Sequence, residues 1–363
     1  MRWRAAAGVL GAAVLTGAVL VLRGQVPPPT PPAPPSTASP PVAVADPGLP
    51  VREPELAPRW RVFTAQRDAI DGVVGPQHVV YIRPDGDQLE LTVQLKATGA
   101  ELLRHGVRHD EAPWASLLHD GLLLVVGGQP VRLIALDPAT GAVREIAPPA
   151  GYSFRPQLVD VGDEVLLLGW QDGQQRSCVL AVQARTGASR VAWCAQEGTS
   201  PSWLYEGQDE ATWPATSVPQ PGCLQWQRLR SGGQVQPMPQ NPWLCGAWGL
   251  VDVGGWQVAQ RPERDAAQPL IVASDGSRPL ALGIAAAFVG CGRHVYWSAA
   301  TDGVYPDVVY RWEPGADYRE VVYKLGSSTR YTLGLPRCTD GVLSVAMTTR
   351  DHRVVELYAL SRP

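Results

Sequence analysis

Residues 131–146 read VRLIALDPATGAVREI. Two apolar, strand-like runs, VRLIALD and AVREI, flank a turn that contains Thr140 and Gly141. Because glycine accepts a positive φ without steric cost, such a turn between two apolar runs predicts a β-hairpin. Residues 179–193, VLAVQARTGASRVAW, repeat the pattern around Thr186 and Gly187. The recurrence indicates an internal repeat.

The repeat runs through most of the chain. We expect an apolar strand to begin, just after a polar or glycine-containing turn, at seven positions: Val79, Leu122, Val165, Ala211, Trp256, Val295 and Val342. These positions are separated by 43, 43, 46, 45, 39 and 47 residues. Periods of this length are typical of radial or stacked arrays, in which each unit buries its apolar face against its neighbours.

One unit contains four strand-like runs, which in the second repeat are residues 114–118, 122–126, 131–136 and 142–146. Four short antiparallel strands in a unit of this length are typical of a β-propeller blade. The sequence therefore predicts an all-β, seven-bladed β-propeller over residues 59–363. A stacked solenoid is the alternative, but it requires capping repeats and fits four-stranded units poorly.

The last repeat is one strand short. It begins at Val342, and the sequence stops at Pro363, near the place where its hairpin turn would lie. Residues 60–64, WRVFT, form a strand-like run with no repeat of their own. We expect this N-terminal strand to close the seventh blade, which would pair the two ends of the ring and remove an open sheet edge.

Two of the units resemble a known family. LIALDPATGAVREI and VLAVQARTGASRVAW are similar to the repeat of the PQQ-like (quinoprotein-type) propellers, in which an aliphatic strand with Ala-Leu-Asp precedes a Thr-Gly turn and a terminal Trp. Trp193 holds the terminal position in one unit, and Ile146 replaces it in the other. Quinoprotein dehydrogenases have eight blades and cofactor and calcium ligands that we do not place in this sequence, so no cofactor is expected. Non-enzymatic members of the superfamily act as periplasmic scaffolds, which is the closer analogy.

The N-terminal region is not globular in composition. Residues 5–22 form an uncharged run, which as a helix would span about 27 Å, close to the roughly 30 Å hydrocarbon core of a bilayer. We expect a single transmembrane helix that acts as a signal anchor. Arg2 and Arg4 precede it, so residues 1–4 should be a cytoplasmic stub and the C-terminal domain should be extracytoplasmic, either periplasmic or extracellular. A cleaved signal peptide is the alternative, although the matching Ala43-Val44-Ala45 site lies far downstream.

Residues 23–58 are predicted to be a disordered, proline-rich stalk. Residues 24–58 contain 13 prolines, which cannot donate backbone hydrogen bonds and favour polyproline II. A semi-rigid tether is expected of such a segment, and a proline-rich motif for a partner is the alternative. The net charge of −3 gives no large field that would attract nucleic acid or anionic lipid, so we expect membrane contact only through the N-terminal helix.

The cysteines predict three disulfides, because an even number in an exported chain indicates oxidised pairs. Their arrangement around the expected hairpins and turns pairs Cys178 with Cys194, Cys223 with Cys245, and Cys291 with Cys338. A zinc site is the alternative, but the chain has no close C-x-x-C pair with interleaved histidine, so no metal is expected.

Candidate binding residues come from the connections between blades, which cross one face of a propeller towards the mouth of its channel. The connection from the first blade to the second is expected to carry His109, Asp110 and Glu111, and equivalent positions bring Arg155 and Arg330 to the same face. A histidine beside a carboxylate could act as a general base or help to hold a metal. The alternative is a solvated polar loop that has no binding or catalytic function.

A periodic row of aspartates is open to two interpretations. Asp120, Asp163, Asp209 and Asp340 recur two residues before strand starts; a carboxylate row suggests calcium, while turn capping explains the period more simply.

Tryptophan is frequent, with 13 residues against three phenylalanines. Trp203, Trp243, Trp248 and Trp256 fall in the fourth and fifth blades. They could pack between blades or form a binding surface, and Trp243 is included among the binding candidates.

The sequence contains no nucleophile elbow, phosphate-binding loop or zincin helix. We therefore expect a membrane-tethered extracytoplasmic binding or scaffold module, whose partner is another envelope protein or a small extracellular ligand. The alternative is a propeller enzyme, hydrolase or lactonase-like, with its site at the channel mouth; a purely structural envelope protein is a third possibility. An enzyme should bring several of His109, Glu111, Arg155 and Arg330 into one pocket, whereas a binder should expose aromatic side chains on a broad face.

Overall fold

The computed structural model describes residues 48–360 except 54–59, 65–68, 109–114, 129, 175, 197–200, 202, 208–209, 216–224, 240–241, 262–268, 278, 286, 302–304, 327–329, 350 and 352. The chain divides into two units, Met1–Val42 and Ala43–Pro363. All described residues belong to the second unit, which alone is considered below. The predicted anchor, residues 5–22, lies outside the described residues, and no helix among the described ones is long and apolar enough to cross a membrane.

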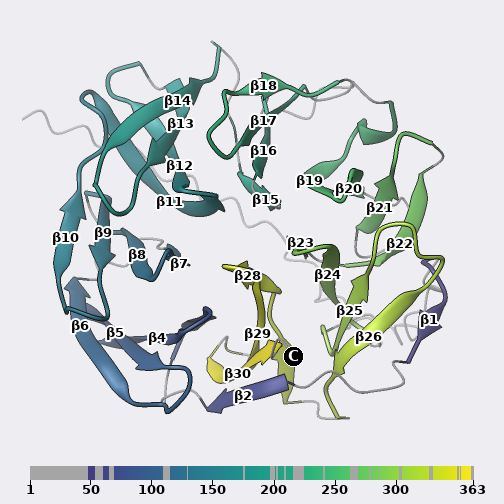
Figure 1. Ribbon diagram of the computed structural model, residues 1–363, viewed down its shortest axis with the longest axis horizontal. Helices are drawn as coiled ribbons and strands as arrows, with labels where there is room; N and C mark the ends of the chain where they lie inside the picture. Colours follow the sequence, from purple (N-terminus) through teal and green to yellow (C-terminus); the bar gives the residue numbers. More distant parts are fainter. Residues whose placement is uncertain are drawn as a thin grey trace, which may run out of the picture. The chain divides into compact units, whose positions relative to one another are not determined.

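The second unit is a seven-bladed β-propeller, as predicted (Figure 1). Its first three blades, from the inner strand outwards, consist of β3 (Asp71–Val74), β4 (His78–Asp85), β5 (Gln88–Leu95) and β6 (Glu101–Arg108); β7 (Ala115–His119), β8 (Leu122–Gly127), β9 (Arg132–Leu136) and β10 (Val143–Ile146); and β11 (Tyr152–Val161), β12 (Glu164–Gln171), β13 (Arg176–Val182) and β14 (Ser189–Cys194).

The next two blades consist of β15 (Tyr205–Gly207), β16 (Glu210–Pro214), β17 (Trp226–Arg230) and β18 (Gln236–Pro237); and, after the short 3-10 helix η1 (Pro242–Leu244), β19 (Trp248–Val253), β20 (Trp256–Arg261), β21 (Leu270–Ser274) and β22 (Leu280–Ile284). The last two contain β23 (Ala287–Cys291), β24 (His294–Ala299), β25 (Val308–Trp312) and β26 (Arg319–Lys324); and β27 (Tyr331–Leu333), β28 (Arg337–Thr339), β29 (Val342–Thr349) and β30 (Val354–Leu360).

The predicted strand starts mark the second strand of each blade. The seven strands in question, β4, β8, β12, β16, β20, β24 and β29, each begin at the predicted residue or one residue before it. These strands are nearly continuous in apolar side chains; β8, for example, reads LLLVVG and buries its four central residues. Both faces of such a strand are covered, one by each neighbouring blade, and this double burial produces the repeat in the sequence.

The apolar core lies between the blades. Among the described residues, seven buried clusters each join one blade to the next, from the pair of blades one and two to the pair of blades seven and one. The cluster that joins the last blade to the first contains Val74 and Val79 from one side and Leu357 and Ala359 from the other. The sheets therefore form a closed ring, and the solenoid alternative is wrong.

The N-terminal strand closes the seventh blade, as predicted. Strand β2 (Trp60–Thr64) pairs antiparallel with β30, from Trp60 opposite Leu360 to Thr64 opposite Glu356. Phe63 packs against the cluster that joins blades seven and one. Figure 1 shows this purple strand beside the yellow end of the chain.

A second N-terminal strand was not predicted. Strand β1 (Val51–Arg52) pairs in parallel with the outer strand of blade six, with Val51 opposite Arg319. The backbone N–H of Arg319 donates to the carbonyl of Pro50 over 3.0 Å, and Leu49 is buried in the cluster of blades five and six. This strand lies within the segment assigned to the stalk.

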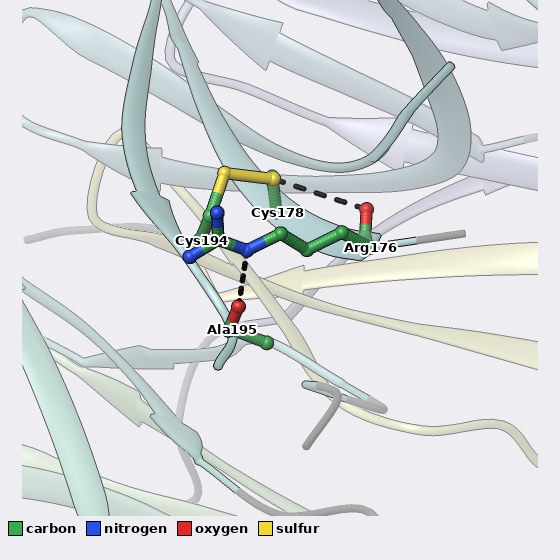
Figure 2. The surroundings of a disulfide bond; sticks show 4 residues. All are labelled: Arg176, Cys178, Cys194 and Ala195. Carbon is green, nitrogen blue, oxygen red and sulfur yellow. Dashed lines mark hydrogen bonds between the residues drawn. A yellow bond between two sulfur atoms is a disulfide. The ribbon is translucent and has the colours of Figure 1, made fainter. Parts of the chain in front are cut away.

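Two of the predicted disulfides are present. Cys178 and Cys194 face each other on β13 and β14 with a Cα–Cα distance of 4.0 Å, and Figure 2 shows the Arg176 side chain donating to the Ala195 carbonyl beside them. Cys291 and Cys338 join the inner strands of blades six and seven, with Cα atoms 5.5 Å apart. The third predicted pair includes Cys223, which lies outside the described residues.

Candidate functional site

A cavity of about 500 Å³ occupies the channel at the centre of the ring. Its walls come from the first residues of the inner strands, including Ala115 on β7, Ala287 on β23 and Arg337 on β28. The connections between blades deliver the chain to these strand ends, so the cavity opens on the face for which the sequence predicts binding. In Figure 1 the strands β7, β11, β15, β23 and β28 lie nearest the centre.

Two large apolar side chains at the rim of this cavity are exposed, and two half-buried aromatic rings lie beside them. Trp203 is 59% exposed and Leu335 is 54% exposed, and both line the cavity together with Tyr205, Phe288 and Pro336. We call these five residues the aromatic mouth. Trp248, at the start of β19, is 48% exposed and directly precedes a glycine that touches two of the five. Large exposed apolar groups gathered around a concavity are typical of binding sites.

Trp203 is held by its neighbours. The next residue, Leu204, is buried, and its backbone forms two hydrogen bonds with the Gln157 side chain: Nε2 donates to the Leu204 carbonyl over 2.8 Å, and the Leu204 N–H donates to Oε1 over 3.1 Å. Gln157 lies in an irregular part of β11, between Phe154 and Leu158. Such irregularities redirect side chains near functional sites, and this one fixes the backbone that carries Trp203.

Tyr205 and Phe288 pack over a glycine. Gly249, with φ of 71°, causes a register shift in β19 between Trp248 and Leu250. A β-carbon there would lie 3.3 Å from both the Tyr205 and the Phe288 rings, and the positive φ would strain any other residue. The Tyr205 ring also stands 5.9 Å from that of buried Trp226. The mouth is therefore preformed.

Ionisable side chains gather where the channel approaches the opposite face. Buried His119, at the end of β7, places Nδ1 3.0 Å from Oδ1 of Asp160 on β11. Burial opposes a charge on His119, but the hydrogen bond to Asp160 and the charges of Asp160, Asp340 and Asp120 outweigh it and raise its pKa. Burial raises the pKa of the Glu206 carboxyl to about 8, and the charges of Asp160 and Asp340 act in the same direction. The group can therefore hold protons near neutral pH.

A second cavity, of about 820 Å³, opens among the turns that join the first and second strands of blades. His119, Asp120, Asp163, Arg185 and Asp340 are among its lining residues. The guanidinium of Arg185 on blade three forms an ion pair with the Asp120 carboxylate on blade two. This cavity lies at the other end of the inner strands, away from the aromatic mouth.

The periodic aspartates act in turns, as the simpler interpretation predicts. Asp120 and Asp340 adopt φ of 51° and 48°, and each precedes a glycine of positive φ, the arrangement of a type I′ turn. Asp209 lies outside the described residues. Among the described residues, no group of three or more His, Cys, Asp or Glu side chains could hold a metal ion.

The structure describes three of the candidate residues named from the sequence, Arg155, Arg330 and Trp243. His109, Asp110 and Glu111 lie outside the described residues. The Arg155 guanidinium stacks over Trp170 at 4.8 Å, Arg330 is exposed, and neither lines either of the two cavities.

Trp243 requires a correction. Only 9% of it is exposed, and it packs in the core between blades four and five with Met238 and Leu244. It lies in η1, before the turn into blade five, where Trp243 and Leu244 fill the gap between the sheets. Among the residues whose burial is described, the exposed tryptophans are Trp203 and Trp248. Both lie at or just before the start of an inner strand, and this position was the available signal.

Replacing Glu206 by glutamine is expected to stabilise the protein increasingly as the pH rises. The folded pKa is raised from 4.5 to about 8, so between these values the folded state keeps a proton that the unfolded chain releases, and stability falls with rising pH. Glu206→Gln should remove up to about 1.4 kcal/mol per pH unit from this slope. Urea unfolding at several pH values measures it. Glu145→Gln, on exposed β10, is the control, and equal slopes in the two variants would contradict the assignment.

The known proteins that match this chain are similar to it in fold alone. No protein-family profile and no curated protein sequence matches the chain. An oligogalacturonate lyase from Vibrio parahaemolyticus superposes with a TM-score of 0.53 at 10% identity, covering 85% of this chain and 98% of its own.

Two other solved structures are similar to the same degree. The β-propeller domain of the Trilobed protease from Pyrococcus furiosus gives a TM-score of 0.53 at 14% identity over 83% of this chain and 96% of that domain. The Neurospora crassa Pan2 WD40 domain gives 0.53 at 10% identity over 86% and 98%. Since these proteins differ in activity and the identities are low, what the chain shares with them is the seven-bladed propeller fold.

Proposed function

We propose that this propeller is a binding module, anchored at the outer side of a membrane through residues 5–22, which takes a partner protein of the envelope at the aromatic mouth. The observation that carries the binding role is Trp203: a tryptophan more than half exposed, yet held through its neighbour by the two hydrogen bonds of Gln157. Rigid aromatic anchors give affinity at a low entropic cost and are typical of interface centres.

The enzyme alternative has less support. Neither Arg155 nor Arg330 lines a cavity with the ionisable groups of the channel. The extracytoplasmic location draws support from the two disulfides, since such bonds persist in oxidising compartments.

An aromatic photo-crosslinking residue, which keeps a ring at position 203 of the full chain, is expected to give a discrete adduct with a partner in cells, because that position would lie inside the interface. The matched control is position 143, an apolar position on the outer strand β10 that is 45% exposed. The adducts are read by mass on gels and by mass spectrometry. The same adducts from both positions, or none from position 203 of the folded chain, would contradict the proposal.

A further inference from the structure

The aromatic mouth favours an uncharged occupant. The charged residue types that line the cavity among the described residues are Asp71, Glu206 and Arg337. Arg337 Nη1 lies 2.9 Å from Oδ2 of Asp71, so these two neutralise each other. Glu206 lies deeper in the channel, where burial raises the pKa of its carboxyl to about 8. An acidic or basic segment would therefore find no counter-charge here, whereas an apolar segment needs none.

The composition of the cavity lining suits proline. Trp203 and Leu335 are exposed at the rim, and the half-buried rings of Tyr205 and Phe288 line the cavity beside them. Aromatic grooves of this kind recognise polyproline II segments, whose rings pack against the aromatic faces and whose backbone is already extended before binding. Because little conformational entropy remains to be lost, such segments bind shallow surfaces that flexible chains do not.

We propose that the aromatic mouth binds uncharged, proline-rich segments, and that its occupant is residues 27–35 of a second copy of this chain. The inference rests on the proposed binding function and names the partner. Residues 27–35 read PPPTPPAPP, and residues 24–45 contain no charged side chain. Copies anchored in one membrane would meet at a raised effective concentration, which strengthens a contact of modest affinity.

A free peptide of the sequence PPPTPPAPP is the probe for the mouth. The receptor is the full chain in detergent with its seven prolines between positions 27 and 35 replaced by serine, so that no competing run is present. The peptide carries a fluorescent label, and titration should raise its anisotropy in a saturable manner, a readout that does not depend on Trp203. Trp203→Ala should weaken binding by about tenfold or more, while Val143→Ala should leave it unchanged. A peptide with serine at every proline should not bind.

Leu335→Ser provides a second variant of the mouth, since Leu335 is 54% exposed and its replacement should preserve folding if Trp203→Ala does not. Absence of peptide binding, or equal binding by the wild-type mouth and both mouth variants, would overturn the polyproline assignment.

Sedimentation of the full chain in detergent tests whether the occupant of the aromatic mouth comes from a second copy of the chain. The wild type is expected to form a concentration-dependent dimer that is lost in Trp203→Ala and in the serine-replaced chain. A chain that binds the peptide but stays monomeric at every concentration would overturn the second copy as the occupant. A crosslink from position 203 to a different protein, without peptide binding, would overturn the polyproline inference and leave the proposed binding function standing.

Discussion

Deleting residues 60–64 should lower the free energy of unfolding by about 5 kcal/mol, because the seventh blade would lose its outer strand. Strand β2 contributes five residue pairs to β30, and Phe63 packs against the cluster that joins the last blade to the first. Without it, β30 becomes an open edge that is free to pair with other chains. Guanidinium unfolding and the onset of aggregation measure the two effects.

The control for this deletion is Val62→Ala on the same strand. Val62 is 47% exposed, so its truncation should change stability by no more than about 0.5 kcal/mol. If the deletion and Val62→Ala gave the same midpoint, the ring would not depend on the N-terminal strand for its closure.

Loss of the Cys291–Cys338 disulfide should be the next most destabilising change. The bond joins residues 47 apart in sequence, and in the chain-entropy treatment a loop of this length corresponds to about 4 kcal/mol. It also joins the inner strands of blades six and seven, the latter being the blade that β2 completes. Unfolding of the Cys291→Ala/Cys338→Ala double variant without reductant measures the cost.

The Cys178–Cys194 pair is the matched comparison for that experiment. It closes a loop of 16 residues within one hairpin, for which the same treatment gives about 3 kcal/mol. The interblade pair should therefore be the more costly to remove. A greater loss from Cys178→Ala/Cys194→Ala would show that ring closure gains little from the bond between blades.

The ring could be predicted from sequence because its units repeat. Each second strand is buried on both sides, which leaves an apolar run such as Leu122–Gly127 at a nearly constant interval. The last unit has one strand fewer than the others, and the run at 60–64 belongs to no unit. Together these two features predict that residues 60–64 complete the seventh blade. Strand β1 could not be found in this way, since it has only two residues, both exposed, in a proline-rich stretch.

The candidate site was less predictable because it is assembled from many blades. His119 and Asp160 are 41 residues apart and meet only because both lie near the same end of neighbouring inner strands. Gln157 holds the residue after Trp203 from a different blade, and no local pattern records such a contact. Trp243 was predicted to be a binding residue for a related reason. The sequence alone does not distinguish a tryptophan that is exposed in a connection from one that is buried between two blades.

The parallel pairing of β1 with β26 has a mechanical consequence. A tension applied to the chain at Gly48 would reach the Val51–Arg319 pairing before it reached Trp60. Such a load would act first on the two residue pairs that join β1 to β26, which would have to separate before β2 was loaded. A force on the chain before residue 48 would therefore load β1 before it loaded β2, the strand that closes the ring.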